Sequence, residues 1–347
     1  MDELQLLEDL LKIYSPTGQE AEAVNYLVMQ MRAGGLEARV DEVGNAVGEA
    51  GPAEATRTVM LLGHIDTVPG FIPVTRDGDR LNGRGAVDAK GPLAAFTAAA
   101  IRAKEQLSGL RVIVIGAVGE EGNSRGAHFI KDRYRPDFTI IGEPSGWDKV
   151  TLGYKGSAWF DYEVRRALAH TAARDESACE AAVAFWNRVT AWAAERNSAH
   201  TRMFEQVLPT LREMSSGSDG FIEHARLKFG VRLPPGVAVD ELHNALAALA
   251  SGASLNLIEG VPAYRGEKNT PLVRALLAAI RQAGGNPSFS VKSGTSDMNI
   301  VGPAWGTPIV AYGPGDSALD HTPDEHILLS EYQRAITVLV QTLLRLV

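Results

Sequence analysis

The stretch TVMLLGHID, residues 58–66, decides the fold class. Its first six residues are nearly all apolar, which is typical of a strand buried on both faces of a parallel sheet. Two further stretches, RVIVIGAV at 111–118 and FTIIG at 138–142, have the same character. An alanine-rich segment at 89–107, long enough for about five helical turns, separates the first two strands. Strands that alternate with helices in this way predict an α/β domain with a mostly parallel sheet.

Two helices are expected on the N-terminal side of this region. The first lies within residues 1–14, whose apolar residues recur at helical spacing. It should end near Ser15 and Pro16, since proline disfavours the helical conformation in the residue before it. Thr17 and Glu20 then have the spacing of a capping box, which predicts that the second helix begins there.

The pattern changes after residue 155. We expect six elements in the order strand, helix, strand, strand, helix, strand, which is the order of a ferredoxin-like α+β unit, at 156–164, 176–196, 207–214, 221–232, 239–249 and 254–259. A helix at 271–283, a short strand near 308–312 and a final amphipathic helix at 330–346 should follow. The chain is therefore predicted to form a discontinuous α/β domain, 1–155 and 261–347, interrupted by a smaller domain, 156–260.

The composition excludes several classes of protein. At 347 residues the chain is longer than one hydrophobic core usually supports, so two domains are expected. A net charge of −8 and the lack of a basic stripe exclude a general nucleic-acid binder. No run of about 18 apolar residues supports a membrane span, and the acidic N-terminal segment does not have the form of a secretory signal. The single cysteine, Cys179, excludes a disulfide within the chain and fits a cytoplasmic location.

Polar residues stand where the predicted strands end. His64 and Asp66 directly follow the strand at 58–63, and their spacing of two residues places both on one face. An open α/β sheet carries its ligand site at this end, although a hydrogen-bonded internal pair has the same pattern. Asp88, in GRGAVDAKG, precedes the helix at 89–107 and is either a ligand or a helix cap.

Two adjacent carboxylates, Glu120 and Glu121, follow the strand at 111–118. Adjacent side chains of extended backbone point to opposite sides, so one carboxylate can bind a metal while the other holds a proton. A solvated acidic turn is the alternative. Glu143 and His321 follow two further strands. Two histidines and three carboxylates, without cysteine, suit zinc or a similar divalent ion and are enough for a pair of ions.

Together, these motifs resemble the M20 family of metallopeptidases and aminoacylases. The resemblance covers essentially the whole chain, through SPTGQE, GHIDTVP, GRGAVDAKG, GEEGNSRGA, GEPS, AHTA, GVRLPPG and DHTPDEHI in order. It implies a zinc-exopeptidase-like catalytic domain at 1–155 and 261–347, and a dimerisation or lid domain at 156–260.

The resemblance implies two divalent ions per subunit, zinc or cobalt. Asp88 would bridge both ions. Glu121 and His321 would complete the ligands of one ion, and His64 and Glu143 those of the other.

Further roles follow from the same resemblance. Asp66 would orient the imidazole of His64, and Glu120 would be the general base. The peptide between Asp88 and Ala89 would be cis. His170 of the inserted domain would enter the active site of the partner subunit, which implies a homodimer.

Within the family, the stretches GEPSGWDKVTLGYKG, GNSRGAHFI and KSGTSDMNI resemble the branch that releases lysine or ornithine from a small acidic amino-group carrier protein. The α-carboxylate of the product calls for a cation or backbone amides, and Arg232, Arg125 and the loop from Gly313 to Gly315 are the candidates. Asp297 is the candidate for the ε-amine of lysine. Basic residues that could form a docking patch for the carrier are Arg133, Arg135, Lys155, Arg165, Arg166 and Arg174.

Two other functions remain open at this point. The same residues would serve a deacetylase of N-acetylornithine or N-acetyllysine, or another small-molecule deacylase of the family. A catalytically silent metal-binding scaffold is the non-enzyme alternative, but a scaffold would not need the carboxylate of Glu120.

Overall fold

The structure, a computed structural model, describes residues 2–170, 172 and 175–347 and divides into two compact units. The first contains the chain up to Gly153 together with Gly266–Ser290 and Ser296–Val347, and the second contains Tyr154–Arg265 and Val291–Thr295. The second unit thus begins and ends slightly outside the predicted 156–260. The short segment 291–295 was not expected there. It is tied to the second unit by a hydrogen bond from the Lys155 N–H to the Lys292 carbonyl oxygen, at 3.1 Å.

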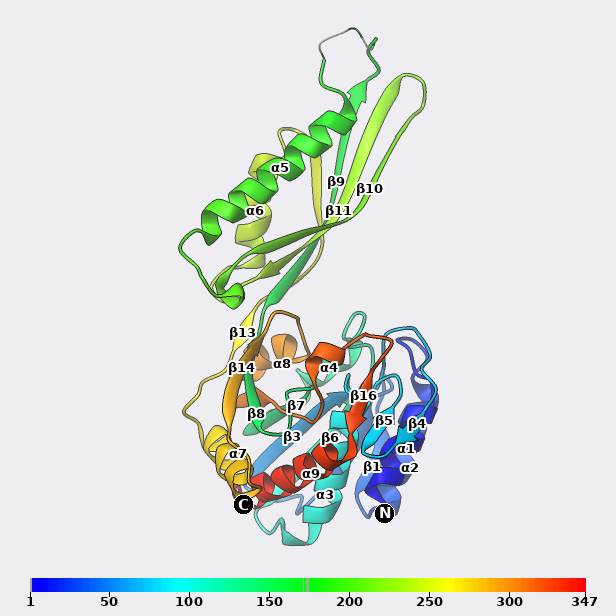
Figure 1. The fold of residues 1–347 in the computed structure, drawn as a ribbon. Coiled ribbons are helices and arrows are strands. Elements are labelled where there is room, and N and C mark those ends of the chain that lie inside the picture. Colours follow the sequence, from blue (N-terminus) through cyan, green and yellow to red (C-terminus); the bar gives the residue numbers. More distant parts are fainter. Residues whose placement is uncertain (1, 171, 173–174) are drawn as a thin grey trace. The chain divides into compact units, whose positions relative to one another are not determined.

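A sheet with a parallel centre forms the core of the first unit (Figure 1). Its strands lie in the order β1 (Glu37–Val40), β2 (Ala46–Ala50), β6 (Leu110–Ala117), β3 (Arg57–His64), β7 (Phe138–Gly142), β15 (Ile309–Ala311) and β8 (Lys149–Tyr154), and β14 (Ser288–Lys292) also pairs with β8. β3 is parallel to both β6 and β7, and β7 is parallel to β15. Three other pairs, β1 with β2, β2 with β6 and β15 with β8, are antiparallel. The predicted α/β class with a mostly parallel central sheet is confirmed.

A second, small sheet in the first unit was not predicted. It has three antiparallel strands in the order β16 (His326–Leu328), β5 (Arg80–Asn82) and β4 (Thr75–Asp77). These strands are only three residues long, so they carry no readable alternation of apolar and polar residues. The pairing of β16 with β5 joins two segments that lie more than 200 residues apart in the sequence.

The helices of the first unit agree with the sequence pattern to within a few residues where they were predicted. They are α1 (Glu3–Lys12), α2 (Ala21–Ala33), α3 (Lys90–Ala103), α4 (Arg125–Ile130), α7 (Pro271–Gln282), α8 (Met298–Trp305) and α9 (Leu329–Leu344), with short 3₁₀ turns η1 (Lys104–Gln106) and η3 (Ser317–Leu319). Nearly all of α3 is buried, because its alanines let it pack against β3 and β6 on one side and α9 on another.

The predicted capping box at Thr17 and Glu20 is wrong. The residue that caps α2 is Glu20 itself, and its side chain makes no capping hydrogen bond. The Thr17 hydroxyl instead donates to Asp66 at 2.7 Å, and the Glu20 carboxylate accepts two hydrogen bonds from Arg125. Partners that are distant in the sequence have therefore replaced the local ones.

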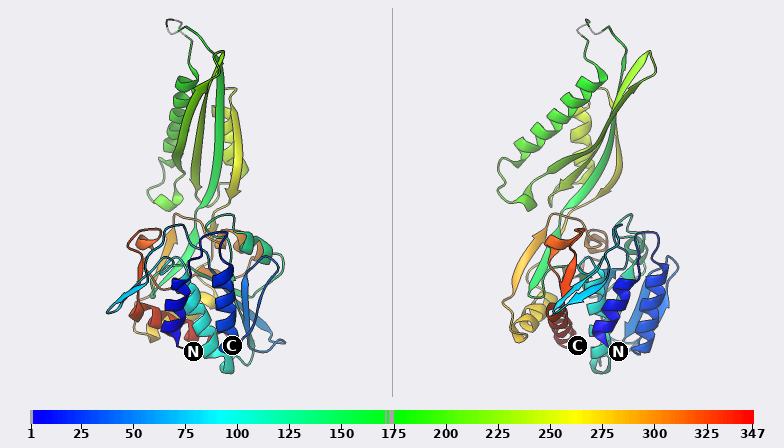
Figure 2. Two further views of the ribbon diagram at one scale, coloured as in Figure 1. Left: turned by 90° about the vertical axis from the view of Figure 1, so that its right-hand side faces the viewer. Right: turned by 45° about the vertical axis from the view of Figure 1, so that its right-hand side comes forward.

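The second unit has the predicted βαββαβ order. Its elements are β9 (Gly156–Ala167), α5 (Ala178–Asn197), η2 (Met203–Glu205), β10 (Leu208–Ser218), β11 (Ile222–Leu233), α6 (Val239–Leu249) and β12 (Ser254–Val261), followed by the short β13 (Tyr264–Arg265). The sheet order is β10-β11-β9-β12, and all neighbours are antiparallel. Both helices lie on the same face of this sheet (Figure 2). The rings of Tyr162 and Phe185 stack there at 4.0 Å in a core separate from that of the first unit.

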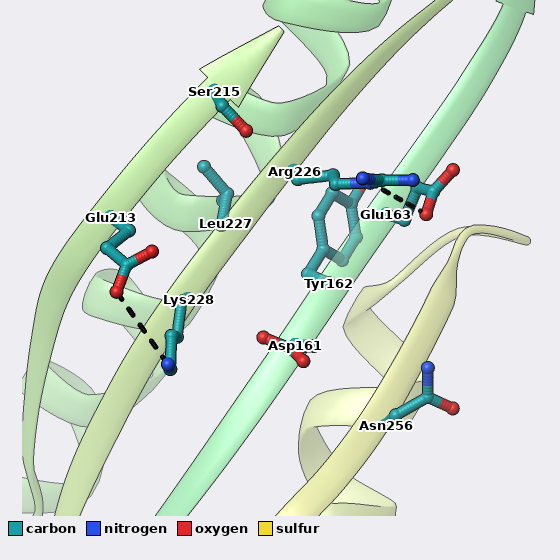
Figure 3. A pocket seen from close by; sticks show the side chains of 9 residues that line it. All are labelled: Asp161, Tyr162, Glu163, Glu213, Ser215, Arg226, Leu227, Lys228 and Asn256. Carbon is teal, nitrogen blue, oxygen red and sulfur yellow. Dashed lines mark hydrogen bonds and ion pairs between the residues drawn. The ribbon is translucent and has the colours of Figure 1, made fainter.

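The other face of this sheet carries a polar hollow of about 460 Å³ (Figure 3). Two ion pairs line it: Lys228 lies 3.7 Å from Glu213, and Arg226 lies 3.0 Å from Glu163. Acids and bases thus alternate across neighbouring strands and offset each other's charge.

Two glycines shape the end of the central sheet. Gly63 and Gly142 are register partners on β3 and β7, and each directly precedes a predicted metal ligand. A Cβ atom at Gly142 would lie 2.8 Å from the Phe96 ring and 3.1 Å from the Gly63 Cα atom. Only glycine lets α3 approach the strands this closely.

Replacing Gly142 with alanine should therefore lower the free energy of unfolding by about 1–3 kcal/mol, the usual cost of overpacking a core. Chemical denaturation measures this change. Gly109→Ala is the matched control, because a Cβ atom there would meet nothing within 4 Å. Equal stability of the two variants would contradict the packing role.

Candidate metal centre

Three neighbouring strands deliver polar side chains to one edge of the central sheet. β3 ends at His64, Glu120 and Glu121 follow β6, and Glu143 follows β7. Because these strands are parallel neighbours, their carboxyl ends meet at the same edge. Loops outside the sheet bring Asp88 from just before α3 and His321 from just after η3.

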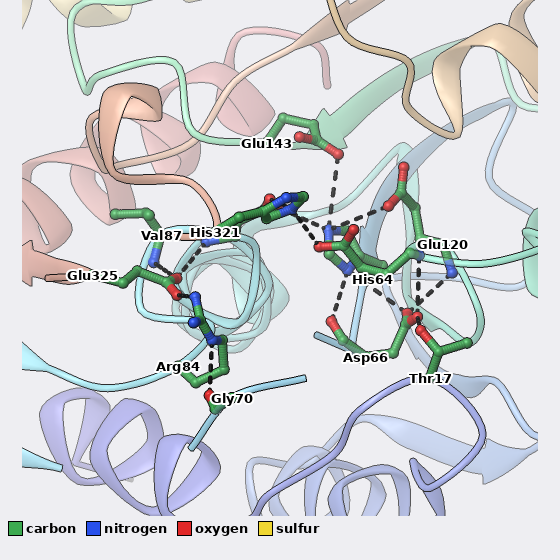
Figure 4. Close-up of polar contacts among 12 residues, drawn as sticks. Thr17, His64, Asp66, Gly70, Arg84, Val87, Glu120, Glu143, His321 and Glu325 are labelled. Atoms are coloured by element: carbon green, nitrogen blue, oxygen red, sulfur yellow. Dashed lines mark hydrogen bonds and ion pairs between the residues drawn. The ribbon is translucent and has the colours of Figure 1, made fainter. Parts of the chain in front are cut away.

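Asp88 lies at the centre of this group. Its Oδ1 atom is 3.1 Å from Nε2 of His64, and its Oδ2 atom is 3.0 Å from Nε2 of His321. Glu121 Oε1 lies 3.0 Å from the same His321 nitrogen, and Glu143 Oε1 lies 4.0 Å from the His64 nitrogen (Figure 4). The Asp88 carboxylate is thus shared by two groups of potential metal ligands. One group contains His64 and Glu143, and the other contains Glu121 and His321.

The buried carboxylate of Asp66 organises the segment that carries the two glutamates. Its Oδ1 atom accepts the backbone N–H of Glu120, and its Oδ2 atom accepts that of Glu121, both at 3.1 Å. Nδ1 of His64 is 2.9 Å from the Asp66 carbonyl oxygen but 3.7 Å from its carboxylate. The backbone of Asp66 therefore holds the imidazole, with Nε2 facing Asp88, while its side chain holds Glu120 and Glu121.

Glu120 lies beside this cluster, with its Oε2 atom 3.9 Å from Nε2 of His64. Burial raises the pKa of Glu120 well above its ordinary value, and Glu143, Asp297 and Glu121 raise it further, although His64 opposes them. A carboxylate whose pKa is raised is a stronger proton acceptor than an ordinary carboxylate.

The two histidines and Asp88 shift one another's pKa values. Burial disfavours the charged form of His64, but Glu120, Asp66 and Asp88 outweigh this effect and raise its pKa well above the ordinary value. Hydrogen bonds to Asp88 and Glu121 raise the pKa of His321 to about 10. Burial opposes ionisation of Asp88, yet His321 and His64 lower its pKa.

These residues fit a pair of divalent cations. Imidazole nitrogens and carboxylate oxygens are the donors that zinc and similar ions take. Donor atoms of His64, Asp88 and Glu121 all lie within 4.8 Å of one another. Several carboxylates with little exposure to solvent repel one another here, so positive charge at this position would relieve their repulsion.

Metal binding should release protons, because a coordinated imidazole must be deprotonated, whereas His321, with a pKa of about 10, carries a proton near neutral pH. The apparent Zn²⁺ affinity should therefore rise with pH between about 6 and about 8. Calorimetric titration in buffers of different ionisation enthalpy counts the protons. His321→Ala should release fewer, whereas His224→Ala, in the second unit, is the control and should release as many as the parent protein. Equal release by both variants would contradict the assignment.

The predicted substrate-binding residues of the first unit lie in different surroundings. Asp297 is buried just before α8, and burial raises its pKa to about 7. Arg125 forms a two-point ion pair with Glu20, both bonds at 3.1 Å. Gly313 and Gly315 accept the backbone N–H groups of Ser145 and Gly146, so their loop supports the turn that follows Glu143.

His170, Arg232 and Lys155 belong to the second unit, whereas Arg133 and Arg135 of the predicted docking patch belong to the first. His170 is exposed in the segment after β9, and Arg232 donates to the Thr295 hydroxyl at 3.3 Å. Lys155 does not belong to an exposed docking patch, which corrects the prediction. It is fully buried and donates to the carbonyl oxygens of Met203, Phe204 and Gln206. Arg174 lies outside the described residues.

Three residues near the centre had no predicted role in the metal site. Thr17 donates to Asp66, while Arg84 and Glu325 form a buried ion pair next to Asp88. All three stand within the quoted motifs SPTGQE, GRGAVDAKG and DHTPDEHI. The spacing of these residues in the sequence does not predict their contacts in the folded chain.

The predicted cis peptide between Asp88 and Ala89 is confirmed.

Comparison with known proteins identifies the family. Residues 60–345 match the model described as "Peptidase family M20/M25/M40". The chain belongs to the M20 family. This M20 chain is 45% identical to the "[LysW]-lysine hydrolase" of Deinococcus radiodurans, over 99% of this chain and 96% of the relative.

Solved structures share its fold. The M20 metallo-carboxypeptidase Sso-CP2 of Sulfolobus solfataricus has a TM-score of 0.81 at 19% identity, with both chains fully covered. The YXEP protein of Bacillus subtilis, described as a dinuclear metal-binding peptidase of the M20 family, has a TM-score of 0.76 at 12% identity, over 99% of this chain and 96% of that one.

Among the described residues, no helix has the length and apolar character that a membrane crossing needs. The cytoplasmic location stays a prediction.

Proposed function

We propose that this chain is a two-metal amide hydrolase that releases lysine, or ornithine, from a small amino-group carrier protein. One observation carries the hydrolase assignment: Asp88 is shared between His64 and His321, and the half-buried carboxyl group of Glu120 lies beside them. The Deinococcus radiodurans relative supports the substrate, because its name specifies [LysW]-lysine and its similarity extends over 99% of this chain.

The ligand set would divide as the distances suggest. His64, Glu143 and Asp88 would hold one cation, and Asp88, Glu121 and His321 the other. Bound zinc or cobalt ions supply Lewis acidity toward the amide carbonyl and lower the pKa of water.

Glu120 would move the proton. It lies within 3.9 Å of His64, and it has a raised pKa. It accepts the proton of the attacking water and then returns it to the leaving nitrogen, since an amine departs only when protonated. Asp66 keeps Glu120 in place by accepting its backbone N–H.

Replacement of Glu120 tests this role. Glu120→Ala should bind metal with unchanged stoichiometry and lose hydrolysis by about 10²–10⁴-fold, the usual contribution of a general base. Metal content and turnover are measured on the same samples. Glu105→Ala is the control, since Glu105 is an exposed acid. Unchanged activity of Glu120→Ala would remove Glu120 from the mechanism.

A substrate panel separates the possible functions. The zinc-loaded and cobalt-loaded proteins should hydrolyse the carrier conjugate of lysine or ornithine faster than N-acetyllysine or N-acetylornithine. The reverse preference would identify a small-molecule deacetylase. If the metal-loaded protein hydrolysed none of these compounds, the result would favour the catalytically silent scaffold.

Recognition of the product is proposed for a few residues. The Oδ1 atom of buried Asp297 has no hydrogen-bond partner among the described residues, which suits a contact with the ε-ammonium group of lysine. Arg232 and the loop from Gly313 to Gly315 are proposed for the α-carboxylate, whereas Arg125 is already paired with Glu20. If Asp297 has this role, an acyl-norleucine, which lacks the ammonium group, should have a higher KM than the matching acyl-lysine. Equal KM values would exclude it.

We also propose that the enzyme works as a homodimer in which His170 serves the partner's site and stabilises the developing oxyanion. The family resemblance and the exposed position of His170 support this arrangement.

Mixing two inactive variants tests the shared site. Glu120→Ala and His170→Ala should each be inactive, but a mixed dimer has one site with both residues. Random mixing should restore about a quarter of the parent activity, because half of the dimers are mixed and each has one competent site of two. Mixed dimers without activity would contradict the exchange of His170.

A further inference from the structure

Three loops meet next to Asp88. Each contributes one residue that is separated by four positions in the sequence from a residue of the proposed site. Arg84 is four residues before Asp88, Glu325 is four residues after His321, and Gly70 is four residues after Asp66. Figure 4 shows Gly70, Arg84, Val87 and Glu325 as one connected group beside the site.

Both oxygens of the Glu325 carboxylate are used. Oε1 accepts the backbone N–H of Val87 at 3.0 Å and that of Asp88 at 3.1 Å. Oε2 accepts Nη1 of Arg84 at 2.7 Å. The side chain of Glu325 thus holds the backbone of the residue whose carboxylate is shared by His64 and His321.

Arg84 joins the other two loops to this group. Its Nε atom donates to the Gly70 carbonyl oxygen at 3.0 Å, and Nη1 also donates to the carbonyl oxygen of Thr322, next to His321, at 3.2 Å. One guanidinium group therefore connects the segments that follow Asp66, precede Asp88 and follow His321. Its rigid fork of donors suits this task.

The small three-stranded sheet brings the two residues together. β16 begins at His326, directly after Glu325, and β5 ends at Asn82, two residues before Arg84. His326 and Asn82 are register partners, and the Gly83 N–H donates to the Glu325 carbonyl oxygen at 3.3 Å. The side chains of Glu325 and Arg84 are 1% and 9% exposed, so this pair is fixed behind the site and does not face substrate.

We propose that Arg84 and Glu325 are positioning residues that set the geometry of the metal site before metal binds. This inference rests on the metal site of the proposed function. The pair fixes the backbone at Asp88 and ties it to the His321 loop, so that both Asp88 oxygens face their histidines in advance. His321 itself has a left-handed backbone, with φ of 60°, a conformation that the surrounding contacts must hold. A site organised in advance binds its ligand more tightly, because less ordering is left to the binding step.

The test is metal affinity in the full chain, measured without substrate. Glu325→Gln keeps the shape of the side chain, but its amide group turns N–H donors toward Arg84 or toward the backbone N–H groups. Its Zn²⁺ and Co²⁺ affinities should fall about 10–100-fold, as is usual for residues behind metal ligands. The visible spectrum of the Co²⁺ protein should change as well. Glu241→Gln is the matched control, because Glu241 pairs with Arg196 at the same 2.7 Å but on the surface of the second unit.

A second variant covers a failure of Glu325→Gln to fold. Arg84→Lys keeps the charge but loses the fork, so it should also weaken metal binding and alter the Co²⁺ spectrum. If the ion pair were purely structural, its loss would lower the melting temperature, but it would leave the metal affinities within twofold of the parent protein and the Co²⁺ spectrum unchanged. That result in either folded variant would overturn the proposal. Metal binding is read without turnover, so failure of the substrate assignment would not be mistaken for failure of this inference.

Discussion

Like charges repel one another most strongly where water is excluded, and this chain places several carboxylates at one buried edge of its central sheet. Asp66, Asp88, Glu120, Glu121 and Glu143 are all brought there by β3, β6, β7 and the loop before α3. Three of these carboxylates meet nearby donors: Asp66 accepts backbone N–H groups, and Asp88 and Glu121 lie against histidines. Divalent cations would offset the remaining negative charge of these carboxylates.

The surrounding structure serves this arrangement. Gly63 and Gly142 let α3 pack closely against the strand ends, so the residues that follow them emerge side by side. Thr17 and Asp66 fix the segment that carries Glu120 and Glu121. Arg84 and Glu325 fix the loop that carries Asp88. The candidate ligands Glu121 and Asp88 are thus each held in place by hydrogen bonds from neighbouring residues.

The second unit has a different physical basis. Its core of stacked aromatic rings lies between one face of a four-stranded sheet and two helices, and it shares none of its buried residues with the core of the first unit. Its open face carries alternating acids and bases, whose pairing keeps a wide polar surface stable in water. His170 stands in an exposed loop of this unit.

The sequence by itself determined the two-unit plan and the candidate ligands. Long apolar runs and helical spacing are local properties, and they correctly predicted β3, β6, β7, α3 and the βαββαβ unit, with His64, Glu120, Glu121 and Glu143 at the strand ends. Only the tertiary structure decided the supporting contacts. Thr17 donates to Asp66 and forms no capping box, and Lys155 is buried and donates to backbone carbonyl groups. Glu325 pairs with Arg84, 241 residues away in the sequence, because strands of three residues bring the two segments together. Short strands and single polar residues have no periodicity to read, so their partners are chosen by whichever buried donors and acceptors the folded chain brings within reach.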